Sequence, residues 1–223
     1  MLAEVERQQD DYLVAWVEGP TIVDGFTQVI CEDSAPRPCP SGVPKCQARA
    51  RDRWLEARGR ELLPTRYVHV VFTLPSQLAP LALQNKSEVY GLLFRASAET
   101  LLTVARDEKH LGAEMGFFSV LHTWNQKLLH HPHVHCVVPA GGLSPDHTRW
   151  IAARPGFFLP VRVLSRVFRG KFVAGLRGLH AAGKLGFHGG LVGLAAPAAF
   201  AAMLRGLFRS AWVVYAKRPF LAA

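Results

Sequence analysis

Hydrophobic residues follow two different patterns from residue 67 onward, and each pattern predicts its own kind of element. Dense runs of β-branched and aromatic residues predict strands at 67–74, 117–124, 133–138 and 211–215. Apolar residues at helical spacing predict helices at about 87–107, 165–179 and 197–209. Ser87 and Ser165 are the predicted N-caps, and Pro197 fits the first turn of its helix.

The strands at 117–124 and 133–138 follow one another across a short polar stretch, which predicts an antiparallel hairpin. The mixture of strands and helices predicts an α+β fold, with a mainly antiparallel sheet and flanking helices. We therefore expect one main domain over 67–223.

The first 66 residues do not share this patterning. Residues 1–46 lack clear periodicity, and Ala35–Lys45 is a proline-rich loop. Residues 47–63 contain strong helix formers and many charges, and Pro64 ends the predicted helix. We predict a separate segment at 1–46 and a basic linking helix at 47–66.

Composition indicates a chain that can bury a core. Of the 223 residues, 49% are hydrophobic, which is far from the composition of a disordered protein. The acidic opening residues do not resemble a signal peptide, and the longest apolar run, 189–204, is interrupted by Pro197. The sequence predicts a cytoplasmic protein with no membrane partner and with reduced cysteines.

Positive charge is concentrated in the second part of the chain. Residues 136–223 contain 12 Lys and Arg residues in total, and Asp146 is the only Asp or Glu in the same range. A polyanion is the natural partner of such a segment, with nucleic acid ahead of an anionic membrane surface. A solvated basic face without a partner is the alternative on charge alone.

The candidate chemistry lies in a strand rich in histidine. Alternate side chains of a strand share one face, so His133 and His135 project together while Val134, Cys136 and Val138 point toward the core. Two such imidazoles can hold one divalent ion and leave positions open for a phosphate oxygen. Spacing alone leaves a satisfied polar strand face as an equal alternative.

Two other His-x-His folds fit poorly. An amidohydrolase barrel needs about 250 residues with the pair near its start, but only 88 residues follow His135. A hydrolase with clustered His and Asp ligands needs downstream carboxylates, and Asp146 is the one available.

A family resemblance covers residues 44–220. The matching stretches are PKCQARARDRW, ELLPTRYVHVVFTLP, LGAEMGFFSVLHTW, HPHVHCVVPAGGLS, FFLPVRVLSRVFRGKF and WVVYAKRP. In this order they resemble the rolling-circle insertion-sequence transposases of the HUH (His-hydrophobic-His) class with paired tyrosines. The resemblance implies an HUH endonuclease-like fold with the His-x-His motif on a central strand.

The same resemblance implies a chemistry. His133 and His135 would bind Mg or Mn, and a tyrosine hydroxyl would attack single-stranded DNA and leave a 5′-phosphotyrosine bond. The DNA partner would be single-stranded or hairpin element ends, and bound protein would be associated with the nucleoid. The candidate DNA-binding residues are Arg166, Arg169, Lys171, Lys217 and Arg218.

The chain departs from the family pattern at both ends. The family's tyrosine motif follows the WVVYAKRP strand, but the sequence stops eight residues after Tyr215, so no catalytic tyrosine is assigned and the isolated chain is expected to be inactive in cleavage. Cys46 matches the last cysteine of the family's zinc module, whereas Cys31 and Cys39 form no Cys-x-x-Cys pair, so a structural zinc site is not expected. A truncated, degenerate transposase is therefore the predicted function.

Two alternatives stay open. A noncatalytic DNA-binding protein would use the same basic surface without cleaving a strand. An unstable product of a degenerate reading frame would have no function and would be insoluble on expression.

Overall fold

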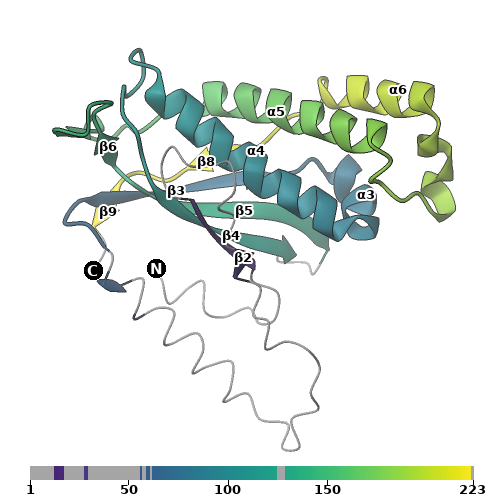
Figure 1. Ribbon diagram of the computed structural model, residues 1–223, viewed down its shortest axis with the longest axis horizontal. Coiled ribbons are helices and arrows are strands. Elements are labelled where there is room, and N and C mark those ends of the chain that lie inside the picture. Colours follow the sequence, from purple (N-terminus) through teal and green to yellow (C-terminus); the bar gives the residue numbers. More distant parts are fainter. Residues whose placement is uncertain are drawn as a thin grey trace, which may run out of the picture.

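A mainly antiparallel sheet forms one layer of the molecule, and helices cover one of its faces (Figure 1). The computed structural model describes residues 13–17, 28–29, 56, 59–60, 62–124 and 129–221. The main sheet has the strand order β2-β1-β4-β5-β3-β8, with β9 also pairing with β3, and every pair is antiparallel. The predicted α+β class is confirmed.

The bounds of β3, β4 and β5 agree closely with the predicted hydrophobic runs, whereas β1, β2, β6, β7 and β9 were not predicted. The strands of the main sheet are β1 (Leu13–Val17), β2 (Gln28–Val29), β3 (Arg66–Thr73), β4 (Phe117–Trp124), β5 (His130–Pro139), β8 (Val214–Ala216) and β9 (Phe220–Leu221). A second, two-stranded sheet pairs β6 (Gly141–Leu143) with β7 (Trp150–Ala152). The predicted last strand is shorter than expected, because only three of its residues pair with β3.

The helices also follow the predicted pattern. They are α3 (Ala79–Gln84), α4 (Lys86–Arg106), α5 (Val161–Ala181) and α6 (Pro197–Leu207), with short 3-10 turns η2 (Ser76–Leu78) and η3 (Gly189–Ala195). Glycines do not interrupt α5, although each costs up to about 1 kcal/mol in a helix interior. At Gly175 a Cβ would lie 2.3 Å from Cδ1 of Leu92, so glycine there lets α5 approach α4 closely.

Both predicted serine caps are wrong, and the reason is tertiary in each case. α4 begins at Lys86 with Asn85 as N-cap, and the Asn85 side chain binds the backbone of Leu81 and Gly186 instead of capping the helix. α5 begins four residues before Ser165, whose hydroxyl donates to the carbonyl of Trp212. A hydroxyl that serves a distant segment cannot be recognised from local sequence.

The core lies between the sheet and the helices. Phe72 of β3 packs against Phe168 of α5 with ring centroids 5.0 Å apart, and Trp212 lies within 5.6 Å of both Phe168 and Phe172. Fully burying one such side chain contributes about 1.5–3 kcal/mol. This cluster joins α5 to β3 and to the segment before β8, and so fixes the edge of the sheet.

Part of the first 66 residues belongs to the sheet. We predicted a separate segment at 1–46, but β1 pairs along its whole length with β4 and extends the sheet beyond it. Within the predicted linking helix, Glu56 and Arg60 are helical and form an i,i+4 ion pair of 2.6 Å. The rest of both predictions lies outside the described residues.

Among the described residues, no single helix is long and apolar enough to cross a membrane. One pair, η3 and α6, passes the same length and composition test only when taken together, across a bend of 102°.

Candidate metal centre

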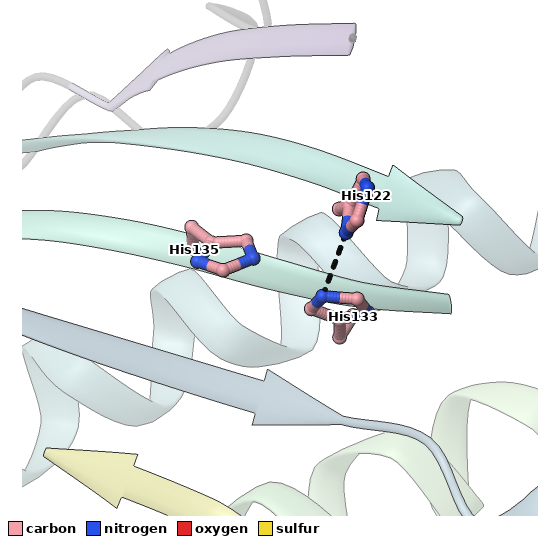
Figure 2. A group of neighbouring side chains, drawn as sticks. All are labelled: His122, His133 and His135. Atoms are coloured by element: carbon pink, nitrogen blue, oxygen red, sulfur yellow. Dashed lines mark hydrogen bonds between the residues drawn. The ribbon is translucent and has the colours of Figure 1, made fainter. Parts of the chain in front are cut away.

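Three histidines from two neighbouring strands meet on the sheet face that the helices leave uncovered (Figure 2). His122 lies on β4, and His133 and His135 lie on β5. One nitrogen of each ring lies within 4.8 Å of the others. The prediction that His133 and His135 share a face is confirmed, and His122 joins them because it pairs directly with His133 across the hairpin.

The alternation along β5 separates this site from the core. Val134, Cys136 and Val138 are completely buried on the helix side, as predicted, while His133 and His135 are half-buried on the other side. Burial raises the pKa of the Cys136 thiol to about 12, so this cysteine is a packing residue and not a ligand.

Hydrogen bonds orient the His133 ring. Its Nδ1 lies 2.6 Å from the carbonyl oxygen of His131. A carbonyl only accepts, so Nδ1 carries the proton and Nε2 keeps its lone pair. Nε2 accepts a hydrogen bond from Nδ1 of His122 at 3.0 Å, so a cation bound to this lone pair would take the place of the proton on Nδ1 of His122.

A fourth histidine supports His135 from the next strand. His69 of β3 places its Nε2 2.7 Å from Nδ1 of His135, and the two rings stack with centroids 4.9 Å apart. If Nδ1 of His135 donates this bond, its Nε2 is left free for a metal. Such contacts behind a ligand commonly fix the tautomer and the direction of a ligating imidazole.

The imidazoles of the centre are held neutral, which metal ligation requires. Burial, together with the nearby histidines, lowers the pKa of His135 to about 3. Burial also lowers the pKa of His133 to about 4, against the opposing effect of its bond to the His131 carbonyl. Burial lowers the pKa of His122 and His69 as well, and Lys217 adds to the effect at His69.

These low pKa values predict acid destabilisation. An unfolded histidine has a pKa of about 6.5, so between that pH and about 4 the unfolded chain binds protons that folded His133 and His135 do not. Folding stability should then fall as the pH falls through this window. We expect the melting temperature, measured without metal from pH 7.5 to 4.5, to drop less steeply in a His133→Gln, His135→Gln variant. If the curves of Tm against pH were parallel for the wild type and the variant, they would contradict the low pKa values of His133 and His135.

The residues do fit a divalent ion, with a small adjustment. Two imidazole nitrogens at about 2.0–2.1 Å from one ion can be at most about 4.2 Å apart. The ligand atoms here spread to 4.8 Å, so slight rotations of the rings would close the site. The metal-binding group contains no carboxylate among the described residues.

The predicted DNA-binding residues fall on two different surfaces. Arg166, Arg169 and Lys171 belong to α5 in the helix layer, where Lys171 pairs with Glu99 at 3.2 Å and Arg169 lies over the Phe208 ring. Lys217 and Arg218 follow β8 and are exposed. The structure brings Lys217, but not the α5 residues, beside the histidine cluster, since its backbone N–H donates to the His69 carbonyl.

Three of the four tyrosines lie in the described part of the chain. The Tyr67 hydroxyl accepts from the backbone N–H of Leu63, and the Tyr90 hydroxyl lies 2.7 Å from Nε2 of His130. Both residues are buried, whereas Tyr215 on β8 is 55% exposed. Tyr12 lies outside the described residues, and the absence of a catalytic tyrosine stays a prediction.

Sequence reasoning missed His122 and His69. Alternation within the predicted strand 117–124 could have placed His122 on the face away from the core, but its pairing with His133 depends on the hairpin register, which carries an irregularity between His122 and Trp124. His69 gives no local signal, because β3 becomes the neighbour of β5 only in the folded sheet.

Two family models match the sequence. One, described as "Putative transposase", matches residues 116–223, which include the whole histidine cluster except the supporting His69. The other, described as "Transposase zinc-binding domain", matches residues 5–74. Cys31, Cys39 and Cys46 fall within the second match, but they lie outside the described residues.

Two curated proteins are similar to the chain. A "Putative transposase y4qJ" of Sinorhizobium fredii is 61% identical over 177 residues, covering 79% of this chain and 44% of that protein. The transposase of insertion sequence element IS801 from Pseudomonas savastanoi pv. phaseolicola is 39% identical over 115 residues, covering 52% and 26%. The chain thus spans less than half the length of these relatives.

Among solved structures, the chain matches the conjugative relaxase TrwC in complex with oriT DNA, in its metal-bound structure. The sequence identity is 19% and the TM-score is 0.42, over 51% of this chain and 44% of that chain. Both family models and both curated relatives are described as transposases or as a domain of one. The chain is similar to the family described as "Putative transposase" over residues 116–223 and to the zinc-binding domain of transposases over residues 5–74. The resemblance seen in the sequence is confirmed.

Proposed function

We propose that this chain provides the metal centre with which a rolling-circle transposase cleaves and joins single-stranded DNA. The observation that supports this most is the meeting of His122, His133 and His135 on one uncovered sheet face. A bound divalent ion would polarise the scissile phosphate there as a Lewis acid. The chain's part is to hold the ion with three neutral imidazoles and to leave coordination positions open for phosphate oxygens.

The ligand set favours Mn over Mg. Mg prefers oxygen ligands, whereas imidazole suits borderline transition metals. Because the group contains three imidazoles and no carboxylate among the described residues, Mn fits it better. We expect Mg to bind more weakly than Mn at equal concentration.

The reaction of the whole transposase would be a transesterification. A tyrosine oxygen attacks the phosphorus of the DNA strand, the bond from phosphorus to the 3′ oxygen breaks, and the 5′ phosphate stays on the tyrosine. We assign no residue of this chain as that nucleophile. The noncatalytic DNA-binding alternative shares the substrate but lacks this step.

Binding of single-stranded DNA with and without Mn tests the proposal. We expect Mn to strengthen binding of a labelled single strand carrying element-end sequence, because a phosphate oxygen gains a place on the ion. The strengthening should disappear in a His133→Ala, His135→Ala variant that is still folded. If Mn changes neither protein's affinity, or both equally, the proposed metal role is wrong.

Denaturing gels of the same mixtures separate cleavage from simple binding. We expect no covalent adduct from the chain alone, because we assign no residue of it as the nucleophile. The Tyr67 and Tyr90 hydroxyls are already engaged in hydrogen bonds. An adduct would show that this chain does contain a nucleophile, and mass spectrometry of the linked peptide would identify it.

A further inference from the structure

The edge strand β8 presents an aromatic and a basic side chain on the same face as the metal centre. Tyr215 pairs with Val71 on β3, and Val71 pairs with His135 on β5. Residues directly opposite one another in antiparallel strands point to the same face. Tyr215 and His135 therefore lie in one row across the sheet, with a single strand between them.

The distance along this row is short. Neighbouring strands lie about 4.7–4.9 Å apart, so two steps separate the backbones of Tyr215 and His135 by about 10 Å. A strand of DNA held at the histidines by one phosphate would lay its neighbouring nucleotides over β3 and β8.

Lys217 lies two residues beyond Tyr215, just after the end of β8, so the alternation of the strand places it on the same face. Its backbone N–H donates to the His69 carbonyl at 2.8 Å. Arg218 follows it and is exposed. Residues 147–223 contain no Asp or Glu.

Tyr215 is too exposed to serve as a core residue. Its side chain is 55% exposed, whereas Val214 next to it is buried against the helix layer. An exposed aromatic ring beside exposed cations is the arrangement with which proteins bind single-stranded nucleic acid, since the ring stacks on a base and the cations contact phosphates.

We propose that Tyr215 and Lys217 form a binding strip for the single-stranded DNA that flanks the phosphate at the metal centre, with Tyr215 stacking on a base and Lys217 contacting the backbone. This inference rests on the proposed function, because it assumes that the substrate enters at the histidines. The proposal also gives the DNA strand a direction: from the metal centre it runs across β3 toward the edge strand β8.

Direct titration of the full chain tests the strip. The probe is a fluorescein-labelled single-stranded DNA of mixed sequence, and EDTA removes any contribution from metal. Because stacking of a base on an aromatic ring is a large part of such affinity, we expect Tyr215→Ala to weaken binding by about five- to a hundredfold. Tyr215→Phe keeps the ring and should bind within about twofold of the wild type.

Lys217→Gln should weaken binding and lower the slope of log affinity against log salt by about one, as expected for one lost phosphate contact. The matched control is Phe157→Ala, which removes an exposed aromatic ring in the loop before α5 that is not part of the proposed strip, and should leave affinity unchanged. Duplex DNA should compete poorly, because its bases are already stacked.

Three results would overturn the strip. They are wild-type affinity in Tyr215→Ala, an equal loss in the Phe157→Ala control, and equal competition by duplex. An adduct abolished by Tyr215→Phe would also overturn it, by assigning the hydroxyl to chemistry. Stabilisation by Mn, retained in Tyr215→Ala, shows that a loss of DNA binding does not come from a damaged metal centre, so the two proposals fail separately.

Discussion

Thermal stabilisation by Mn is expected to vanish when His133 and His135 are both replaced by alanine. A ligand at about one hundred times its Kd stabilises the folded state by about 2.7 kcal/mol. For a chain of this size that corresponds to a rise in Tm of about 5–10 °C. The double variant loses two of the three neutral imidazoles that meet on the uncovered face, so its Tm should not respond to Mn.

The matched control for this prediction is His131→Ala. His131 lies on the same strand and the same face, with its ring centroid 5.6 Å from that of His133, but it is not one of the three residues of the group. The His131→Ala control should keep most of the Mn-dependent rise in Tm.

His122→Ala alone should reduce the affinity for Mn. An unchanged affinity for Mn would show that the ion does not bind His122.

The second large effect is expected at His69, which contacts a ligand without belonging to the ligand group. Removal of a hydrogen-bond partner behind a metal ligand typically costs about 10–100-fold in affinity. We therefore expect His69→Ala to weaken Mn binding by that factor, measured by calorimetric titration at pH 7.5. His69→Gln should recover much of the loss, because its side-chain oxygen can accept the bond from Nδ1 of His135.

The two variants at His69 distinguish orientation from packing. If His69 had a purely structural role, His69→Ala and His69→Gln would weaken Mn binding to a similar extent. Both variants would then also have a lower Tm than the wild type in the absence of metal. The absorption spectrum of bound Co provides an independent check, since a lost nitrogen ligand changes its bands. A spectrum altered in both variants would make His69 a ligand itself and contradict the supporting role.

Local patterning determined the central strands and the three longest helices of this protein. Runs of β-branched and aromatic residues produced β3, β4 and β5 nearly at their predicted bounds, because side chains that alternate between core and exterior stabilise a strand wherever one face is buried. Apolar residues at helical spacing produced α4, α5 and α6, because that spacing places them on the one face of each helix that is buried. The predicted starts of α4 and α5 were misplaced, because the side chains of Asn85 and Ser165 bind backbone groups distant in the sequence.

The sequence by itself determined that His133 and His135 share a face, since the period of a strand is two and the valines between and beyond them must be buried. Only the tertiary structure decided what surrounds them. The hairpin register placed His122 opposite His133, and the pairing of β3 with β5 brought His69 to His135 from 66 residues away. Hydrogen bonds between strands, which no local pattern encodes, turned a two-histidine motif into a group of three histidines with a fourth behind it.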